Sequence, residues 1–268
     1  MAAETVRTAE ATEPDLSSPI SKALVVLDAV ALAESPPRFV DLLNALPLSR
    51  ATLHRQLRQL TREGMLAYDE VRQTYSIGMR VLRLAHSAWS RASLASVACD
   101  ALDKLSAEIE ETIHLAVLDN NQVLYVDKRL PPRSVSMFSS PGKIGPAYCT
   151  GVGKAMLAAL PEAKLAEAIK AQSFQQHTEK TLVSEQMLRE ELVRIRERGH
   201  AFDDEEHEDT IICVALPILN KRGEPIGALS VTSTTYVTTL EKMAETYLPA
   251  MKIAVQEISE NAQIALGV

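Results

Sequence analysis

Residues 48–64, LSRATLHRQLRQLTREG, combine side chains that can bind DNA with a spacing typical of an amphipathic helix. Leu53, Leu57 and Leu60 recur at i, i+4 and i+7, so they share one face of such a helix. The opposite face and its flanks carry ionic or hydrogen-bonding groups: Thr52, His54, Arg55, Arg58, Gln59 and Arg62. Guanidinium groups bind phosphates and pair with guanine edges in the major groove, so this stretch predicts a DNA-reading helix.

The charge around this helix is opposite to that of the whole chain. Between Leu48 and Arg83, seven arginines stand against three acidic residues, a local net charge of +4, whereas the whole chain carries −7. A basic helix face is by itself usually a solvated surface. Local positive charge inside an acidic protein favours a phosphate-binding module joined to a domain with another task, and argues against nonspecific coating of DNA.

The flanking residues predict the elements that would position the basic face. Ser18-Pro19 is a helix start, and Ser35-Pro36-Pro37 ends that first helix. Its core side would hold four residues at helical spacing: Ile20, Leu24, Leu27 and Ala31. A short second helix over 39–46 leads through Pro47 to Ser49, the N-cap of the third. Gly64 ends the third helix, and residues 65–68 and 74–77 predict a two-stranded wing.

Residues 18–78 are therefore expected to form a winged helix-turn-helix DNA-binding domain. We expect seven of its residues to contact DNA: Ser49, Arg50, Thr52, His54, Arg55, Arg58 and Arg72. Arg50, Thr52 and Arg55 are predicted to contact base edges. Arg58 is predicted to hold a phosphate, and Arg72 on the wing to reach the flanking groove or backbone.

Length and composition predict two domains. With 268 residues and 46% hydrophobic content, the chain can bury a substantial core without disulfides or metals. Its three cysteines lack CxxC spacing, which favours a reducing cytoplasm over a disulfide framework or a structural zinc site. Residues 1–17 are polar and lack the apolar segment of a signal peptide, so we expect a disordered leader. No segment has the length and apolarity of a membrane span.

The second half predicts an antiparallel α+β domain. Residues 79–97 are rich in Ala, Leu and Arg and predict a linker helix, and 98–265 predict the second domain. Alternating hydrophobicity indicates two β-hairpins, one over 113–126 and one joining 211–219 to 225–234. Helices are expected from Thr150, around 162–170 and 184–198, and from Thr239.

The whole arrangement resembles the IclR family of bacterial transcriptional regulators. The resemblance is carried, in family order over roughly residues 18 to 262, by SRATLHRQLRQLTREG, ETIHLAVLD, CTGVGKAMLA, RIRERGHAFDDEEHEDTIICVALPI and GALSVTS. It implies a winged helix-turn-helix, a linker helix and a GAF-like effector domain. It also implies a double-stranded DNA operator, a small organic acid effector, and a homodimer that assembles as a dimer of dimers. The family usually has Lys-Ser-Thr where this chain begins its third helix with Ser49 to Thr52, so no operator sequence follows.

An effector site is expected at the start of the helix after Thr150. Unpaired backbone N–H groups at a helix start bind anions, so Thr150, Gly151 and Val152 are a plausible carboxylate cradle. The resemblance implies that Asp203, Cys213 and Ser230 also contact the effector. Thr232 joins them because the two-residue period of a strand puts it on the face of Ser230.

Two other classes of function remain open at this point. The acidic run 203–209 could hold a metal, but it lacks HExxH, HxxxH and EF-hand spacing, so we expect no metal site and no cofactor. Cys149 and His114 could pair as nucleophile and base, but no orienting third group is recognisable, so we expect no catalytic residues. The alternatives to an effector-controlled regulator are an effector-independent DNA-binding protein and, less favoured, a metal- or ligand-dependent enzyme.

Overall fold

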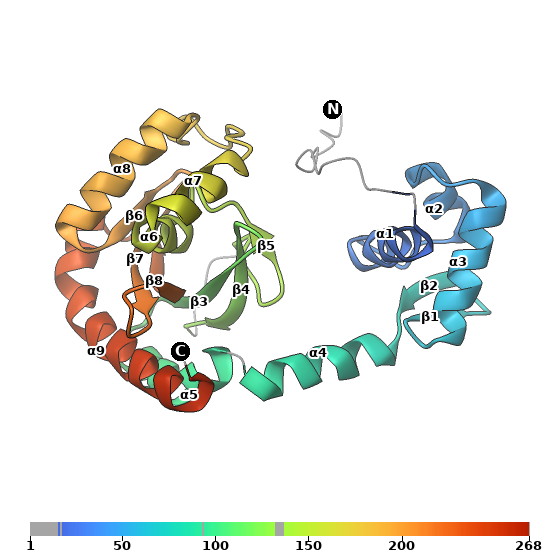
Figure 1. Ribbon diagram of the computed structural model, residues 1–268, viewed down its shortest axis with the longest axis horizontal. Coiled ribbons are helices and arrows are strands. Elements are labelled where there is room, and N and C mark those ends of the chain that lie inside the picture. The colour runs from blue at the N-terminus through green and yellow to red at the C-terminus, as the bar shows by residue number, and fades with distance from the viewer. Residues whose placement is uncertain (1–15, 17, 93, 132–136, 268) are drawn as a thin grey trace. The chain divides into compact units, whose positions relative to one another are not determined.

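The computed structural model describes residue 16 and residues 18–92, 94–131 and 137–267 (Figure 1). The expected leader, residues 1–17, lies outside the described residues except for Leu16. The chain divides into two compact units, one ending at Arg91 and the other beginning at Ala92. In the described part of the chain, no helix is long and apolar enough to cross a membrane.

The N-terminal unit has the predicted three helices and wing (Figure 1). Its elements are α1 (Pro19–Ala31), α2 (Phe39–Ala45), α3 (Arg50–Arg62), β1 (Leu66–Asp69), β2 (Thr74–Ile77) and α4 (Met79–Ala92). Ser18 and Ser49 cap α1 and α3, since their hydroxyls accept hydrogen bonds from the Ser21 and Thr52 amides at 3.0 and 3.3 Å. The stripe of Leu53, Leu57 and Leu60 is buried, as its spacing predicts.

The core side of α1 differs from the prediction. Val26 and Val30 are buried, whereas Ile20 and Leu24 are exposed. The α1 sequence PISKALVVLDAVA carries apolar residues on more than one side, so two stripes satisfy helical spacing. Packing against α2 and α3 selects the stripe that includes the two valines. The prediction that Ile20, Leu24 and Ala31 face this core is wrong, whereas Leu27 is partly buried against it.

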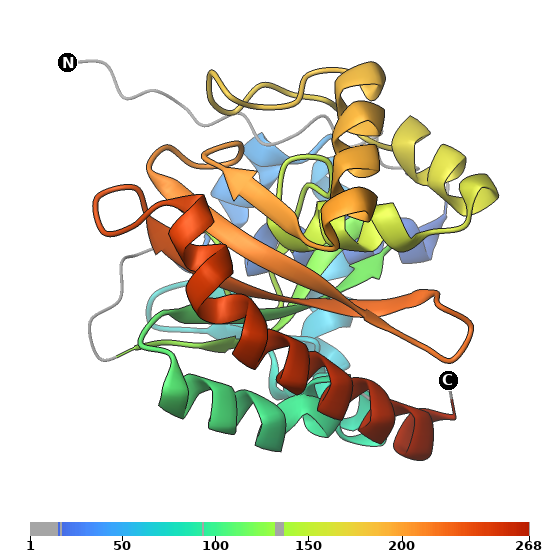
Figure 2. The same cartoon turned by 90° about the vertical axis from the view of Figure 1, so that its left-hand side faces the viewer.

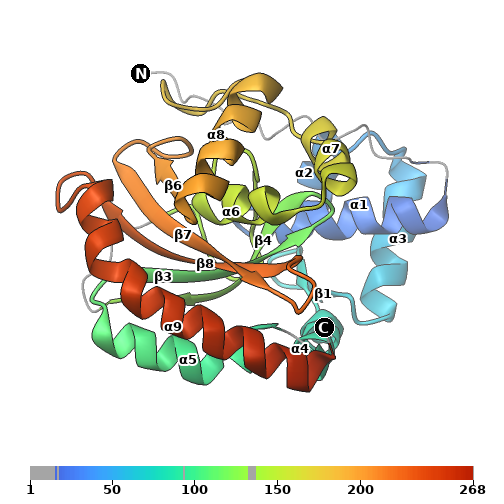
Figure 3. The same cartoon turned by 60° about the vertical axis from the view of Figure 1, so that its left-hand side comes forward.

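The C-terminal unit is a six-stranded antiparallel sheet with helices on both faces (Figures 2 and 3). Its strand order is β5-β4-β3-β8-β7-β6. The strands are β3 (Thr112–Asp119), β4 (Gln122–Arg129), β5 (Ile144–Gly145), β6 (Ala201–Asp204), β7 (Ile211–Leu219) and β8 (Pro225–Thr234). The helices are α5 (Leu94–Glu108), α6 (Gly151–Ala159), α7 (Glu162–Lys170), α8 (Glu185–Arg198) and α9 (Leu240–Leu266). The predicted linker helix 79–97 thus corresponds to α4 and the first residues of α5.

The two faces of this sheet differ in side-chain size. On one face, large residues such as Leu115, Val214 and Val231 pack against α5 and α9, which lie side by side in Figure 3. On the other face, small residues lie under α6: Ala116, Ala215 and Ala228. Small side chains let a helix approach a sheet closely, so α6 lies against the strands. Beyond its N-terminus the same face carries polar residues, and these form a pocket.

Candidate functional site

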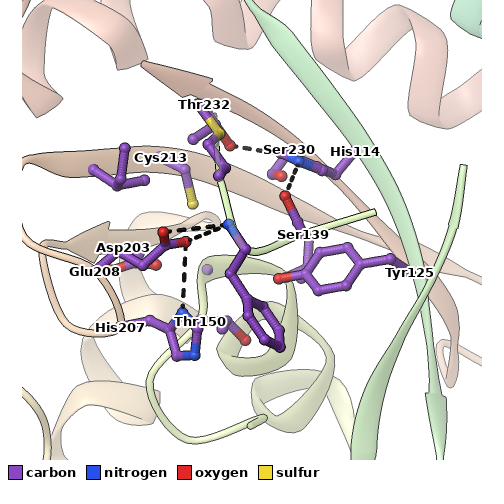
Figure 4. Close-up of a pocket in the computed structure, with 15 residues that line it drawn as sticks. His114, Tyr125, Ser139, Thr150, Asp203, His207, Glu208, Cys213, Ser230 and Thr232 are labelled. Carbon is purple, nitrogen blue, oxygen red and sulfur yellow. Dashed lines mark hydrogen bonds and ion pairs between the residues drawn. The ribbon is translucent and has the colours of Figure 1, made fainter. Parts of the chain in front are cut away.

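A pocket opens between the N-terminus of α6 and the ends of β6, β7 and β8 (Figure 4). The cavity volume is about 30 Å³ in this structure, and it is about 430 Å³ when the space of the open mouth is counted as well. All seven residues predicted to contact an effector line it: Thr150, Gly151, Val152, Asp203, Cys213, Ser230 and Thr232. These residues come from four elements, the start of α6 and strands β6, β7 and β8, and the fold brings them to one cavity.

The register of the sheet explains this convergence. Asp203 on β6 is paired with Cys213 on β7, and Cys213 is paired with Thr232 on β8. These three side chains therefore form one row across the sheet. Ser230 on β8 is paired with His114 on β3, which places a histidine in the neighbouring row.

The start of α6 supplies hydrogen-bond donors to the pocket. Thr150 is the N-cap, but its hydroxyl donates to the Pro146 carbonyl oxygen at 2.7 Å and does not cap the helix. The first backbone amides of a helix lack intrahelical acceptors and lie at the positive end of its dipole. The amides of Gly151 and Val152 can thus receive an anionic group.

Gly151 also makes the close approach of α6 possible. A Cβ atom at this position would lie 2.3 Å from Cys213 Sγ and 3.4 Å from Ala215 Cβ. Ordinary carbon contacts begin near 3.4 Å, so only glycine fits without displacing the helix, the strand or the Cys213 side chain. Gly151 thereby holds its own amide directly over the row that contains Cys213.

Asp203 brings a buried acid to the same place. Its Oδ1 accepts a hydrogen bond from the Glu206 amide at 2.9 Å. Burial, and secondarily the Glu206 carboxylate, raise the pKa of Asp203 to about 7. Glu206 is ion-paired with Lys154, which lies within α6 and has no exposed surface. Asp203, which lines the pocket, and Glu206, which lies outside its lining, are therefore two carboxyl groups close to one ammonium group.

His114 forms the opposite wall with hydroxyl partners (Figure 4). Its Nε2 lies 2.7 Å from Ser139 Oγ, and its Nδ1 lies 3.2 Å from Thr232 Oγ1. Burial, and secondarily Lys128, lower the pKa of His114 to about 3, so the imidazole is neutral near pH 7. The hydrogen-bond partners of the His114 ring are thus Ser139 and Thr232, and Cys149 is not one of them.

Several pocket residues were not predicted from the sequence: His114, Tyr125, Met137, Phe138, Ser139, His207, Glu208 and Ile211. For His114 a signal existed, because it alternates with Ile113 and Leu115 and so lies on the polar face of its strand. Phe138 and Ser139 arrive from the loop before β5, and no local pattern in the sequence indicates where that loop lies.

The acidic run, residues 203–209, does not form a cluster of metal ligands. Among the described residues, no three or more His, Cys, Asp or Glu side chains are placed to hold a metal ion together. Its carboxylates form ion pairs with different lysines. Asp204 and Glu205 are ion-paired with Lys180, and Glu206 is ion-paired with Lys154.

The predicted DNA-contacting residues lie on and near α3 in the N-terminal unit. Ser49, Arg50, His54, Arg55, Arg58 and Arg72 are exposed, and Thr52 is half-buried. Arg72 lies on the turn between β1 and β2, 4.0 Å from Asp69. Among the described residues, Arg55 and Arg58 form no ion pair, so both guanidinium groups are available to a phosphate or a base edge.

Two family models match these two units. The model described as IclR helix-turn-helix domain matches residues 19–70, and the one described as Bacterial transcriptional regulator IclR C-terminal matches residues 86–260. The chain belongs to the IclR family. This IclR-family protein is accordingly a transcriptional regulator with a helix-turn-helix domain and a C-terminal effector domain.

Known proteins similar to this IclR-family chain agree with that assignment. The HTH-type transcriptional regulator KdgR of Escherichia coli is 28% identical over 247 residues, which cover 92% of this chain and 93% of the relative. The crystal structure of the Thermotoga maritima IclR has a TM-score of 0.73 and 28% identity, covering 91% of this chain and 98% of that one. An IclR homologue from Microbacterium hydrocarbonoxydans, complexed with 4-hydroxybenzoate, has the same fold, with a TM-score of 0.79, 21% identity, and coverage of 92% and 100%.

Proposed function

We propose that this IclR-family regulator binds a DNA operator through α3 and the wing, and that a small organic acid in the α6 pocket controls this binding. One observation carries the effector part: the seven residues expected to contact an acid lie around a single cavity. The amides of Gly151 and Val152 would receive the carboxylate. Ser230 and Thr232 would hydrogen-bond the same end of the ligand.

The rest of the pocket favours a compact ligand with an apolar body. Beside the polar groups, the cavity is lined by four largely apolar side chains: Tyr125, Met137, Phe138 and Ile211. Small-molecule sites commonly combine such apolar walls with a few placed hydrogen-bonding groups. The 4-hydroxybenzoate complex of the Microbacterium homologue supports an organic acid as the class to test first.

On the DNA side, Arg50, Thr52 and Arg55 would contact base edges, with Ser49 and His54 beside them. Arg58 and Arg72 would contact the DNA backbone or the flanking groove. The absence of competing acids around Arg55 and Arg58 among the described residues supports this assignment. The protein would act in the cytoplasm, with residues 18–78 as the DNA-binding domain, 79–97 as the linker helix and 98–265 as the effector domain.

Exposed apolar side chains support assembly into a homodimer, and further into a dimer of dimers. Ile20 and Leu24 on α1 are 74% and 53% exposed, and Met79 and Leu82 on α4 are 71% and 60% exposed. Such residues lose their contact with water when a second copy covers them. A dimer would present two α3 helices to successive major grooves.

Thermal denaturation against a panel of pyruvate, gluconate and 4-hydroxybenzoate tests the effector proposal. We expect at least one acid to raise the Tm of the protein, since a ligand that binds the native state stabilises it. Ser230→Ala should abolish the shift. Thr234→Val also removes a hydroxyl from the same face of β8, but Thr234 does not line the pocket, so this variant should keep the shift. Equal shifts in both variants would contradict the assigned site.

An effector-independent regulator is the second candidate. It predicts that no acid changes either the Tm or the affinity for an operator selected from random DNA. Acid-sensitive binding to that operator would exclude this candidate.

A further inference from the structure

Two acids line the α6 pocket among the described residues: Glu208, whose carboxylate accepts a hydrogen bond from the Phe138 amide, and Asp203. The charge state of Asp203 decides what it can bind. One of its oxygens, Oδ1, is occupied by the Glu206 amide. Among the described residues, none donates a hydrogen bond to the other oxygen, Oδ2. The Asp203 side chain lies beside Cys213 and the N-terminus of α6, where a ligand carboxylate is proposed to bind.

Charge balance in this region leaves Asp203 without a cation of its own. The titratable groups that face it are Cys149 before α6, Lys154 on α6, Cys213 on β7, Tyr125 on β4, and Glu206, His207 and Glu208 in the turn after β6. Lys154 is the one lysine or arginine among them, and Glu206 already pairs with it. Buried charges in proteins are normally paired, so two carboxyl groups over one ammonium group favour retention of one proton.

We propose that Asp203 meets the effector in its protonated form and donates a hydrogen bond from Oδ2 to an ionised ligand carboxylate, so that an Asp203 that is ionised in the free protein takes up a proton from solvent on binding. This inference rests on the proposed organic-acid function and specifies its chemistry. Lys154 acts as a positioning residue, because its pair with Glu206 holds the turn that orients Asp203. An ionised Asp203 would instead repel the ligand carboxylate.

The state of the free protein agrees with this assignment. Burial and the Glu206 carboxylate raise the pKa of Asp203 to about 7. An acid with that pKa is roughly 90% protonated at pH 6 and roughly 10% protonated at pH 8. If only the protonated form binds, the affinity for an ionised acid falls by about tenfold over this range, although the ligand itself does not titrate there.

Asp203→Asn separates the two charge states, because an amide resembles the neutral acid in shape and donates a hydrogen bond. We expect the variant to retain binding of whichever panel acid (pyruvate, gluconate or 4-hydroxybenzoate) binds the parent protein, with an affinity that varies less than twofold between pH 6 and pH 8. Asp204→Asn is the matched control, since Asp204 is half-exposed and paired with Lys180, and it should keep the tenfold fall. Loss of acid binding in Asp203→Asn, or a parent affinity independent of pH, would overturn the proposal.

A ligand-free measurement keeps this test separate from the proposed function. A carboxyl group whose pKa is raised by folding stabilises the native state less as pH rises from its unfolded value toward 7. The Tm of Asp203→Asn minus that of the parent should therefore increase from pH 5 to pH 8, whereas the difference for Asp204→Asn should not. A constant difference for Asp203→Asn overturns the protonated Asp203. An increasing difference, combined with no acid binding at millimolar concentration, supports protonated Asp203 but contradicts the organic-acid effector.

Discussion

The contact between Gly151 and Cys213 gives a sharp test of how α6 lies on the sheet. In Gly151→Ala, the new Cβ would lie 2.3 Å from Cys213 Sγ, whereas unstrained contacts begin near 3.4 Å. The helix, the strand or the Cys213 side chain must then move by about 1.1 Å, the difference between these two distances. Cys213 lines the pocket, so its sulfur could relieve the contact without backbone movement only by rotating into that cavity. Overpacking of this kind destabilises a core by about 1–3 kcal/mol.

Urea denaturation of four proteins measures this strain as a coupling free energy. Gly151→Ala should lower the free energy of unfolding by about 1–3 kcal/mol, and Cys213→Ala should lower it by about 1 kcal/mol. The double variant Gly151→Ala/Cys213→Ala should be more stable than the sum of the two losses predicts, because removal of the sulfur relieves the contact. Combining Gly151→Ala with Cys149→Ala should give additive losses. A fully stable Gly151→Ala, or additive losses with Cys213→Ala, would refute the close approach of α6.

Three further predictions follow from other contacts. Lys154→Met should cost about 3–5 kcal/mol in urea unfolding, because it leaves Glu206 buried without a cation. Adding Glu206→Gln to this variant should recover at least half of the lost free energy of unfolding. A loss under 1 kcal/mol in Lys154→Met would contradict the buried pair. Since the pKa of His114 is about 3 when folded and 6.5 otherwise, native stability should fall as pH drops from about 6.5 toward 3. The stability of His114→Gln should fall less steeply with decreasing pH than that of the parent. Equal slopes in the two proteins would contradict the buried neutral imidazole. Phe39→Leu should weaken operator binding about two- to fivefold in fluorescence anisotropy, because the Arg50 guanidinium lies 5.5 Å from the Phe39 ring. In an Arg50→Ala background, Phe39→Leu should not change the affinity for the operator. An equal loss of affinity there would contradict the role of the contact between Phe39 and Arg50.

The N-terminal unit was largely predictable because its signals are local. The leucine stripe of α3, the Ser49 cap and the flanking turn residues all act within one helix and its ends. The core side of α1 was not predictable. Apolar residues surround that helix, and only the packing of α2 and α3 decides which of them are buried.

The pocket was predictable in part. The strand period placed Ser230 and Thr232 on one face, and helix-start chemistry indicated Thr150 and Gly151. The position of His114 beside Ser230 depends on the pairing of β3 with β8, two strands more than a hundred residues apart along the chain. Nothing in the local sequence indicates that Lys154 is buried, since lysine is usually exposed unless a partner such as Glu206 accompanies it.

Operator binding with and without an acid tests most directly whether the α6 pocket controls the DNA-binding domain. The duplex would come from selection on random DNA, and its affinity for the full chain would be measured by fluorescence anisotropy at fixed salt, with the acid that raises the Tm. We predict that this acid changes the affinity at least fivefold for the parent and for Thr234→Val, and leaves it unchanged for Ser230→Ala. Affinities that are the same with and without acid in all three proteins would contradict effector control through this pocket.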